Sequence, residues 1–255
     1  MRRRIDWVWF VVIGLIAGFM SGLFGVGGGI LIVPLLITLA GFGQKRAAGT
    51  SLAAIVPTSI AGVISYAVNG DVALIVAAIL CVGSIIGAQL GAVLLHRLPK
   101  RVVQWAFIGF LLIVVVSLFF VIPSRDAVIH LNALSIIGLL ALGLLVGVLS
   151  GILGIGGGAV IVPMLILLFG ASDLVAKGTS LAVMIPTAIS GTIGNARRRN
   201  VDIPAALTIG LCACLTTSLG AIVATALDPA IGNLLFAAFL VAIAVQLTVR
   251  ALRTR

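Results

Sequence analysis

The chain contains the same segment twice. Residues 21–29 read SGLFGVGGG and residues 150–158 read SGILGIGGG, an offset of 129 positions (150 − 21). The same offset relates GTSLA at residues 49–53 to GTSLA at residues 178–182. One unit has therefore been duplicated, and each copy begins with an apolar segment that glycines interrupt. Any fold for this chain must place two such interruptions at corresponding positions.

The composition requires lipid as the solvent for much of the chain. Hydrophobic residues make up 62% of the sequence and charged residues 9%, with a mean hydropathy of +1.37, whereas a soluble domain carries about 25% charged residues. Residues 72–95 and 102–122 contain no charge, and each run is long enough to cross a hydrocarbon core of roughly 30 Å as a helix. Because these runs are continuous and do not alternate as barrel strands do, we predict an all-α polytopic membrane protein.

Charge in the short breaks between apolar runs predicts the topology. Under the positive-inside rule, basic breaks such as residues 45–46, 96–101 and 197–199 belong in the cytoplasm. Each half then has five apolar segments, and this odd number inverts the second repeat relative to the first and leaves both termini cytoplasmic. We predict a first membrane repeat in residues 1–125 and a second in residues 126–255, which together form one integral membrane transport domain. The segments run roughly over residues 7–25, 28–42, 50–68, 72–95 and 102–122, and then over 133–153, 157–171, 180–196, 203–226 and 230–250.

The segment that follows each glycine cluster is short. Residues 28–42 would extend only ~22 Å as a helix, less than the thickness of the hydrocarbon core. These segments are either half-helices or the return limbs of re-entrant hairpins. We therefore predict roughly eight to ten membrane segments, of which two are broken or re-entrant.

The glycine clusters predict an anion site. Four of residues 25–29 are glycine, and glycine costs about 1 kcal/mol relative to alanine at each helical position, so the helix must break there. A helix that restarts near Gly29 presents unpaired N–H groups and the positive end of its dipole, which glycines let an oxyanion approach closely. Inside a membrane such freed groups need an internal partner or a water-filled cavity. Since transporters usually bind substrate at broken segments that match in two repeats, we predict a main-chain anion site at the repeat interface.

The candidate site comprises the glycines of both clusters and the hydroxyls of the two GTS segments. For the glycines, the alternative is close helix packing, which is the usual role of small residues in membrane helices. For the hydroxyls, the alternative is capping of the helices that they open. We expect Gly28→Leu or Gly157→Leu to abolish transport, with the leucine in the anion's place. The predicted substrate-binding residues are Gly25, Gly27, Gly28, Gly29, Thr50, Ser51, Gly154, Gly156, Gly157, Gly158, Thr179 and Ser180, and helix kinks are predicted at Pro34, Pro57, Pro163 and Pro186.

Missing residue types narrow the function further. The chain contains no glutamate, and its six aspartates lie at or beyond segment ends, whereas a cation transporter or proton relay normally needs an acid within the membrane. Cys212 and Cys214 do not share a helix face, and no histidine is near them, so helix packing is favoured over metal binding. Because no paired nucleophile and base or nucleotide motif is apparent, we predict no enzyme activity, no metal and no cofactor.

The net charge of +10 is concentrated in the breaks and tails assigned to the cytoplasm. Positive-inside bias and anionic lipid headgroups explain it, and no soluble domain exists to carry a reader of nucleic acid. We predict a small anionic substrate and membrane lipid as partners, and the sequence leaves a homo-oligomer open.

The duplicated SGxxGxGGG segments, each followed by a proline, GTS and Pro-Thr, resemble the TauE/SafE family, whose members include sulfite exporters. The resemblance covers about residues 10–250. It implies a multi-pass permease of the bacterial plasma (inner) membrane that moves sulfite, sulfonates such as sulfoacetate, or other small organic anions. The two halves differ where Tyr66 corresponds to Asn195, and residues 197–199 (RRR) have no basic counterpart in the first repeat.

We therefore predict a secondary transporter for a small anion, working by alternating access around the backbone site. With a negative cytoplasm, each anionic charge that leaves gains roughly 2.3 kcal/mol per 100 mV, which favours export. The alternatives are an anion channel with the same site and a membrane subunit of a larger transport assembly.

Overall fold

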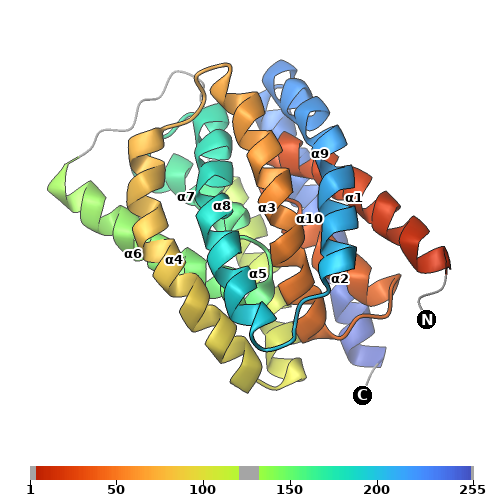
Figure 1. Ribbon diagram of the computed structural model, residues 1–255. Coiled ribbons are helices and arrows are strands. Elements are labelled where there is room, and N and C mark those ends of the chain that lie inside the picture. Colours follow the sequence, from red (N-terminus) through yellow and green to blue (C-terminus); the bar gives the residue numbers. More distant parts are fainter. Residues whose placement is uncertain (1–3, 121–131, 254–255) are drawn as a thin grey trace.

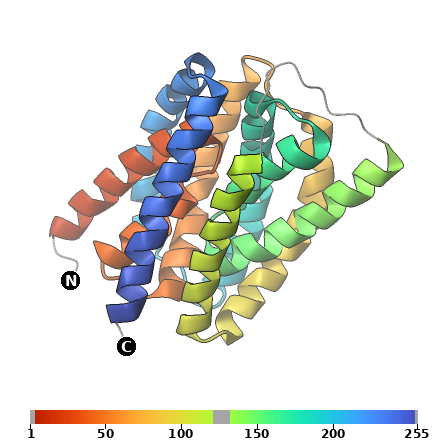
Figure 2. The same ribbon diagram turned by 180° about the vertical axis from the view of Figure 1, so that it is seen from behind.

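The computed structural model describes residues 4–120 and 132–253, and these two ranges form ten α-helices and no strand (Figures 1 and 2). The predicted all-α fold is therefore confirmed. The predicted repeat boundary, between residues 125 and 126, lies outside the described residues. The helices are α1 (Arg4–Phe24), α2 (Gly29–Thr38), α3 (Gln44–Ala67), α4 (Leu74–Arg97), α5 (Lys100–Phe120), α6 (Ala133–Leu153), α7 (Gly158–Phe169), α8 (Asp173–Ala196), α9 (Ile203–Ala226) and α10 (Pro229–Arg253).

The lengths and outer faces of the helices suit a bilayer. Seven helices among the described residues are long and apolar enough to cross a membrane, namely α1, α3, α4, α6, α8, α9 and α10. The helices α2 and α7, which follow the glycine clusters, are shorter. Outward-facing leucines such as Leu211, Leu215 and Leu219 on α9 are each more than half exposed, as expected for side chains that face lipid. The predicted multi-pass membrane protein is thus confirmed.

The two halves use helices of matching length and make matching contacts. The helices α3 and α8 both have 24 residues, as do α4 and α9, and α1 and α6 both have 21. The helix α3 lies beside α8, while α1 packs along α9 and α4 along α6 (Figure 1). The α1–α9 and α4–α6 pairs are equivalent in the two repeats, because α1 of the first repeat corresponds to α6 of the second and α4 corresponds to α9.

The start of α1 and the end of α10 lie near each other at one end of the bundle (Figures 1 and 2). The predicted location of both termini on the cytoplasmic side requires that they lie at the same end of the bundle. The inversion of the second repeat and the side of the membrane on which the termini lie stay predictions, since the structure holds no membrane.

Small residues bring the paired helices into backbone contact. A Cβ atom added to Gly14 would lie 2.5 Å from the carbonyl oxygen of Ile209, across the α1–α9 pair. A Cβ atom on Gly151 would lie 2.5 Å from the carbonyl oxygen of Ala88, across the α4–α6 pair. Close approach through small residues is the usual packing of membrane helices, and it holds the glycine clusters at the ends of α1 and α6 in fixed positions.

One residue in the turn that follows α8 has a strained backbone conformation. Arg199 has a φ of 56°, and it is the one residue other than glycine with a positive φ among the described residues. The corresponding position in the first repeat is Gly70, with a φ of 79°. A left-handed conformation costs a residue with a Cβ atom roughly 1–2 kcal/mol, and the first repeat avoids this cost.

We expect Arg199→Gly to raise the free energy of unfolding by about 1 kcal/mol, because glycine adopts this φ without strain. Thermal or denaturant unfolding of the purified protein in detergent measures the change. The matched variant Arg199→Ala removes the same charge and keeps the Cβ atom, so it should give no comparable gain. Equal stabilisation by both variants would show that charge, rather than backbone strain, limits stability at this position.

Candidate functional site

Both glycine clusters break the chain in the same way. The helix α1 ends at Phe24 and α2 begins at Gly29, while α6 ends at Leu153 and α7 begins at Gly158. Between them lie three glycines in each break with positive φ angles of 67° to 92°. These angles suit residues without a Cβ atom, so the predicted interruptions are present. The glycines concerned are Gly25, Gly27 and Gly28 in the first break and Gly154, Gly156 and Gly157 in the second.

The two breaks are in contact with each other. A Cβ atom on Gly29 would lie 2.6 Å from the carbonyl oxygen of Ile155, and one on Gly158 would lie 2.7 Å from that of Gly25. Neither Gly29 nor Gly158 has a positive φ, so close approach alone requires glycine at these two positions. The first residue of each short helix therefore packs on the backbone of the other repeat.

In each break, a row of backbone N–H groups has no hydrogen-bond partner among the described residues. After each break, the first hydrogen bonds are donated by Leu31 to Gly28 and by Val160 to Gly157, at 3.0 Å in both cases. Among the described residues, the N–H groups of residues 26–30 and 155–159 donate no hydrogen bond, although all these residues are buried. Buried N–H groups are nearly always paired in native structures. Such donors at the start of a helix suit an anion, and the anion-binding role of these glycines stays a prediction.

The hydroxyls of the GTS segments tie the two repeats together. The Oγ of Ser51 donates a hydrogen bond of 2.7 Å to the carbonyl of Gly154, and the Oγ of Ser180 donates one of 2.8 Å to the carbonyl of Gly25. Both serines are fully buried. Since their hydroxyl protons are already directed at carbonyl oxygens of the breaks, these serines support the breaks in this arrangement.

The paired threonines hold the start of helices in the other repeat. The Oγ1 of Thr50 accepts from the backbone N–H of Asp202 just before α9, at 3.0 Å, and that of Thr179 accepts from the N–H of Ala73 just before α4, at 2.9 Å. The expectation that these residues open and cap their own helices is wrong, because α3 begins at Gln44 and α8 at Asp173. Direct contact of the four hydroxyl residues with a substrate stays untested.

Two further hydroxyls at the site belong to the duplicated motif itself. Ser21 and Ser150 occupy corresponding positions one turn before each break and are fully buried. Their Oγ atoms have no hydrogen-bond partner among the residues that the structure describes. An unpaired buried hydroxyl is uncommon, so these two serines supply further hydroxyl donors one turn before the breaks. The repeat comparison could have identified them, because each is the first residue of SGxxGxGGG.

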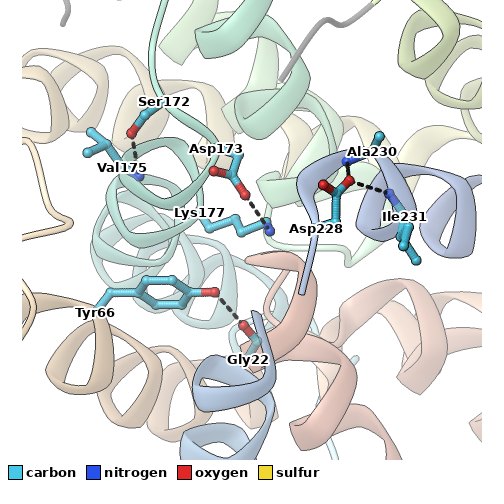
Figure 3. Close-up of polar contacts among 9 residues, drawn as sticks. All are labelled: Gly22, Tyr66, Ser172, Asp173, Val175, Lys177, Asp228, Ala230 and Ile231. Atoms are coloured by element: carbon cyan, nitrogen blue, oxygen red, sulfur yellow. Dashed lines mark hydrogen bonds and ion pairs between the residues drawn. The ribbon is translucent and has the colours of Figure 1, made fainter. Parts of the chain in front are cut away.

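A buried ion pair lies beside the first break, and the corresponding residues at the second break carry no charge. Lys177 Nζ lies 3.2 Å from Asp173 Oδ2, and the two side chains are only 12% and 4% exposed (Figure 3). A Cβ atom on Gly25 would lie 2.6 Å from the Cα of Lys177, whereas Gly154 packs in the same manner on Ala48. The sequence places Asp173 beyond a segment end, but the structure buries it at the start of α8. Its Oδ1 atom has no hydrogen-bond partner in the described part of the chain.

Tyr66 contacts the end of α1 just before the first break. Its hydroxyl donates a hydrogen bond of 2.7 Å to the carbonyl of Gly22 (Figure 3), and its side chain is fully buried. The corresponding Asn195 is too short for this contact and bonds the carbonyl of Gly191 instead, at 2.9 Å. The difference between Tyr66 and Asn195 therefore gives the helix before the first break a hydrogen bond that the helix before the second break does not receive from Asn195.

The predicted kink prolines all lie inside helices. Pro34 is in α2, Pro57 in α3, Pro163 in α7 and Pro186 in α8. Pro163 also lines an apolar crevice of about 460 Å³ between α5, α6 and α7, with Phe110, Leu145 and Met164 among its walls. Because its walls are apolar, this crevice does not suit an anion.

The structure changes the reason for the expected effect of leucine in the breaks. A Cβ atom on Gly28 would lie 2.8 Å from the carbonyl oxygen of Ala17 in α1, and one on Gly157 would overlap the side chain of Val146 in α6. Leucine at either position would therefore collide with the preceding helix rather than fill an anion's place. Loss of transport in these variants would report damaged packing.

We expect Ser180→Ala to lower the free energy of unfolding by about 1–3 kcal/mol, because the buried carbonyl of Gly25 loses its hydrogen-bond donor. Thermal unfolding in detergent measures the change. The control is Thr208→Ala, which removes a hydroxyl bonded to the carbonyl of Pro204 one turn earlier and should stay within about 0.5 kcal/mol of the wild type. Equal losses in both variants would contradict a special role for the bond between the repeats.

Residues that could hold a metal do not gather in the described part of the chain. Cys81, Cys212 and Cys214 are free thiols, and the described residues contain no group of three His, Cys, Asp or Glu side chains that could bind an ion. The chemistry that the breaks offer is hydrogen-bond donation from backbone and hydroxyl groups.

Comparison with known proteins gives a family match across both repeats. A family model described as "Sulfite exporter TauE/SafE" matches residues 1–118 and 139–255. The chain is 27% identical over 256 residues to a probable membrane transporter protein of Haemophilus influenzae, covering 93% of this chain and 96% of that protein. It is 29% identical over 215 residues to the probable membrane transporter protein YunE of Bacillus subtilis, covering 75% and 78% of the two chains. No solved structure matches.

Proposed function

The chain belongs to the TauE/SafE family of membrane transporters, and we propose that it is a secondary permease for a small anion. Sulfite, a sulfonate or a related organic anion is the proposed substrate class, as the family description suggests. One observation carries the proposal, namely the buried N–H groups of residues 26–30 and 155–159, which donate no hydrogen bond among the described residues. Backbone donors at two helix starts complement the oxygens of a small oxyanion.

The distribution of charge supports export as the direction. Lys45 Nζ donates a hydrogen bond of 2.8 Å to the carbonyl of His96, and Arg46 pairs with Asp202 next to residues 197–199. These contacts gather the basic breaks at one end of the bundle, the end assigned to the cytoplasm by the positive-inside rule. A basic mouth raises the local concentration of an anion, and the membrane potential then drives the anion outward.

The proposed cycle alternates access to the breaks from the two sides. The starts of α2 and α7 pack on each other's repeat, so a relative movement of the two repeats would open one side of the contact and then the other. The substrate stays at the same backbone donors throughout. A channel would use the same donors without this movement, and its conductance would exceed the rate of any conformational cycle.

Flux in proteoliposomes under an imposed membrane potential tests the proposal. Purified protein would be reconstituted and the movement of sulfite, sulfoacetate, sulfate and acetate compared. The proposal expects saturable, potential-driven flux of at least one of these anions. Flux of none of them through folded protein would reject the proposed substrate class, and unsaturable conductance would favour the channel.

A further inference from the structure

Met184 on α8 lies where the two breaks meet. A Cβ atom added to Gly27 or to Gly156 would overlap the terminal methyl of Met184, and one on Gly158 would lie 2.9 Å from its sulfur. Met184 is fully buried. The side chain therefore fits only because three glycines from both breaks lack side chains, and it occupies the space directly against the glycine backbone.

The corresponding residue of the first repeat, Ile55, lies at the same place. Its methyl groups lie 3.2 Å from a Cβ position on Gly27 and 3.1 Å from one on Gly156. One side chain from each repeat thus fills the junction of the breaks. The two residues differ in stiffness, because isoleucine is β-branched and held in few rotamers, whereas methionine is unbranched and has three rotatable bonds.

The surroundings of Met184 are those of the predicted substrate. The Oγ of Ser180, one turn earlier on α8, lies 4.0 Å from the sulfur of Met184 and donates to the carbonyl of Gly25. The glycines that Met184 touches belong to the rows of buried N–H groups that donate no hydrogen bond among the described residues. Met184 fills the Cβ side of these glycines, and its apolar side chain excludes water there and offers no strong hydrogen-bond acceptor. An anion that binds next to these glycines would compete with this side chain for space.

We propose that Met184 is the specificity-determining residue of the transporter: its side chain covers the backbone donors in the closed arrangement, swings away when the anion binds, and limits the size of the anion. This inference rests on the proposed function. A small oxyanion needs only a rotamer change at Met184, while a bulkier organic anion would collide with Met184 and Ile55 together. The proposed ligand class is accordingly a small oxyanion.

Flux of two anions of different size through Met184 variants tests the inference. The small probe is the fastest of the four anions in the flux experiment above, and the large probe is benzenesulfonate. The ratio of large-probe to small-probe flux should rise roughly tenfold or more in Met184→Ala, since removing methylenes from a pocket changes discrimination by such factors. Met184→Val, a smaller change, should give an intermediate ratio and serves if Met184→Ala does not fold. Met184→Leu, of similar volume, should restore a ratio near that of the wild type.

The control is Leu80→Ala, which opens a cavity at a fully buried position of α4 away from the breaks and should leave the ratio unchanged. An unchanged ratio in folded Met184→Ala and Met184→Val would overturn the inference while leaving the proposed function intact. The same holds for an equal rise in Leu80→Ala. Flux of none of the four anions through the folded wild type would overturn the proposed function, and this inference with it.

Discussion

Replacing Gly29 or Gly158 by alanine is expected to lower anion flux by about tenfold to a hundredfold, since small misplacements of a site can cost factors of this size. The Cβ atom introduced at position 29 would meet the backbone of Ile155, where the nearest atoms lie 2.6–2.7 Å away, and the one introduced at position 158 would meet the backbone of Gly25 and Val26 at 2.7 Å. Backbone atoms cannot turn aside as a flexible side chain can, so the breaks must separate. Initial rates in proteoliposomes measure the effect.

Gly109→Ala is the matched control for these two variants. Gly109 also lies in a helix, and no neighbouring element of the described chain comes within 4 Å of its Cβ position. Alanine has a higher helix propensity than glycine, so helix propensity alone predicts no loss of flux in any of the three variants. Full flux in Gly29→Ala and Gly158→Ala, with both proteins folded, would show that the contact between the breaks is not needed for transport.

Lys177→Met should destabilise the protein by about 3–5 kcal/mol, the typical cost of removing one partner from a buried ion pair. The methionine stem can still pack on Gly25, but the carboxylate of Asp173, only 4% exposed, would lose the ammonium 3.2 Å away. Denaturant unfolding in detergent, together with the yield of monodisperse protein, measures the loss.

A double variant distinguishes the loss of charge compensation from the loss of side-chain packing at Lys177. In Lys177→Met with Asp173→Asn, the uncompensated buried charge is gone, and most of the lost stability should return. If the double variant is as unstable as the single one, the pair does not act through charge compensation. The position of the pair beside Gly25 would then matter only for packing.

The order of the helices and the two breaks could be predicted from the sequence, because both depend on local properties. Continuous apolar runs locate membrane helices, and three glycines with positive φ in each break stop α1 and α6 where the glycine clusters predict. The apolar pattern places the starts of α3 and α8 too late along the chain. Both helices begin with polar residues, at Gln44 and at Asp173, and hydropathy excludes such residues although they are helical.

The parts of the site that depend on contacts between repeats could not be predicted. The sequence identifies Ser51 and Ser180 as hydroxyls near a break, but which carbonyl each one meets is set by the contact of α3 with the second break and of α8 with the first. Asp173 and Lys177 form a neutral pair in a break of the sequence, which is typical of a solvated loop, and their burial is a property of the tertiary structure. Met184 is one apolar residue in an apolar run, so only its position between the breaks distinguishes it.

The most direct test of the backbone anion site is to locate the anion itself. Selenite has the shape and charge of sulfite, and its selenium atom gives an anomalous diffraction signal, so crystals grown with selenite report its position directly. We predict an anomalous peak whose oxygens lie within about 3 Å of the N–H groups of residues 27–29 or 156–158, with the side chain of Met184 displaced. A peak elsewhere, or no peak from protein that carries selenite in proteoliposomes, would contradict the claim that the two breaks bind the substrate.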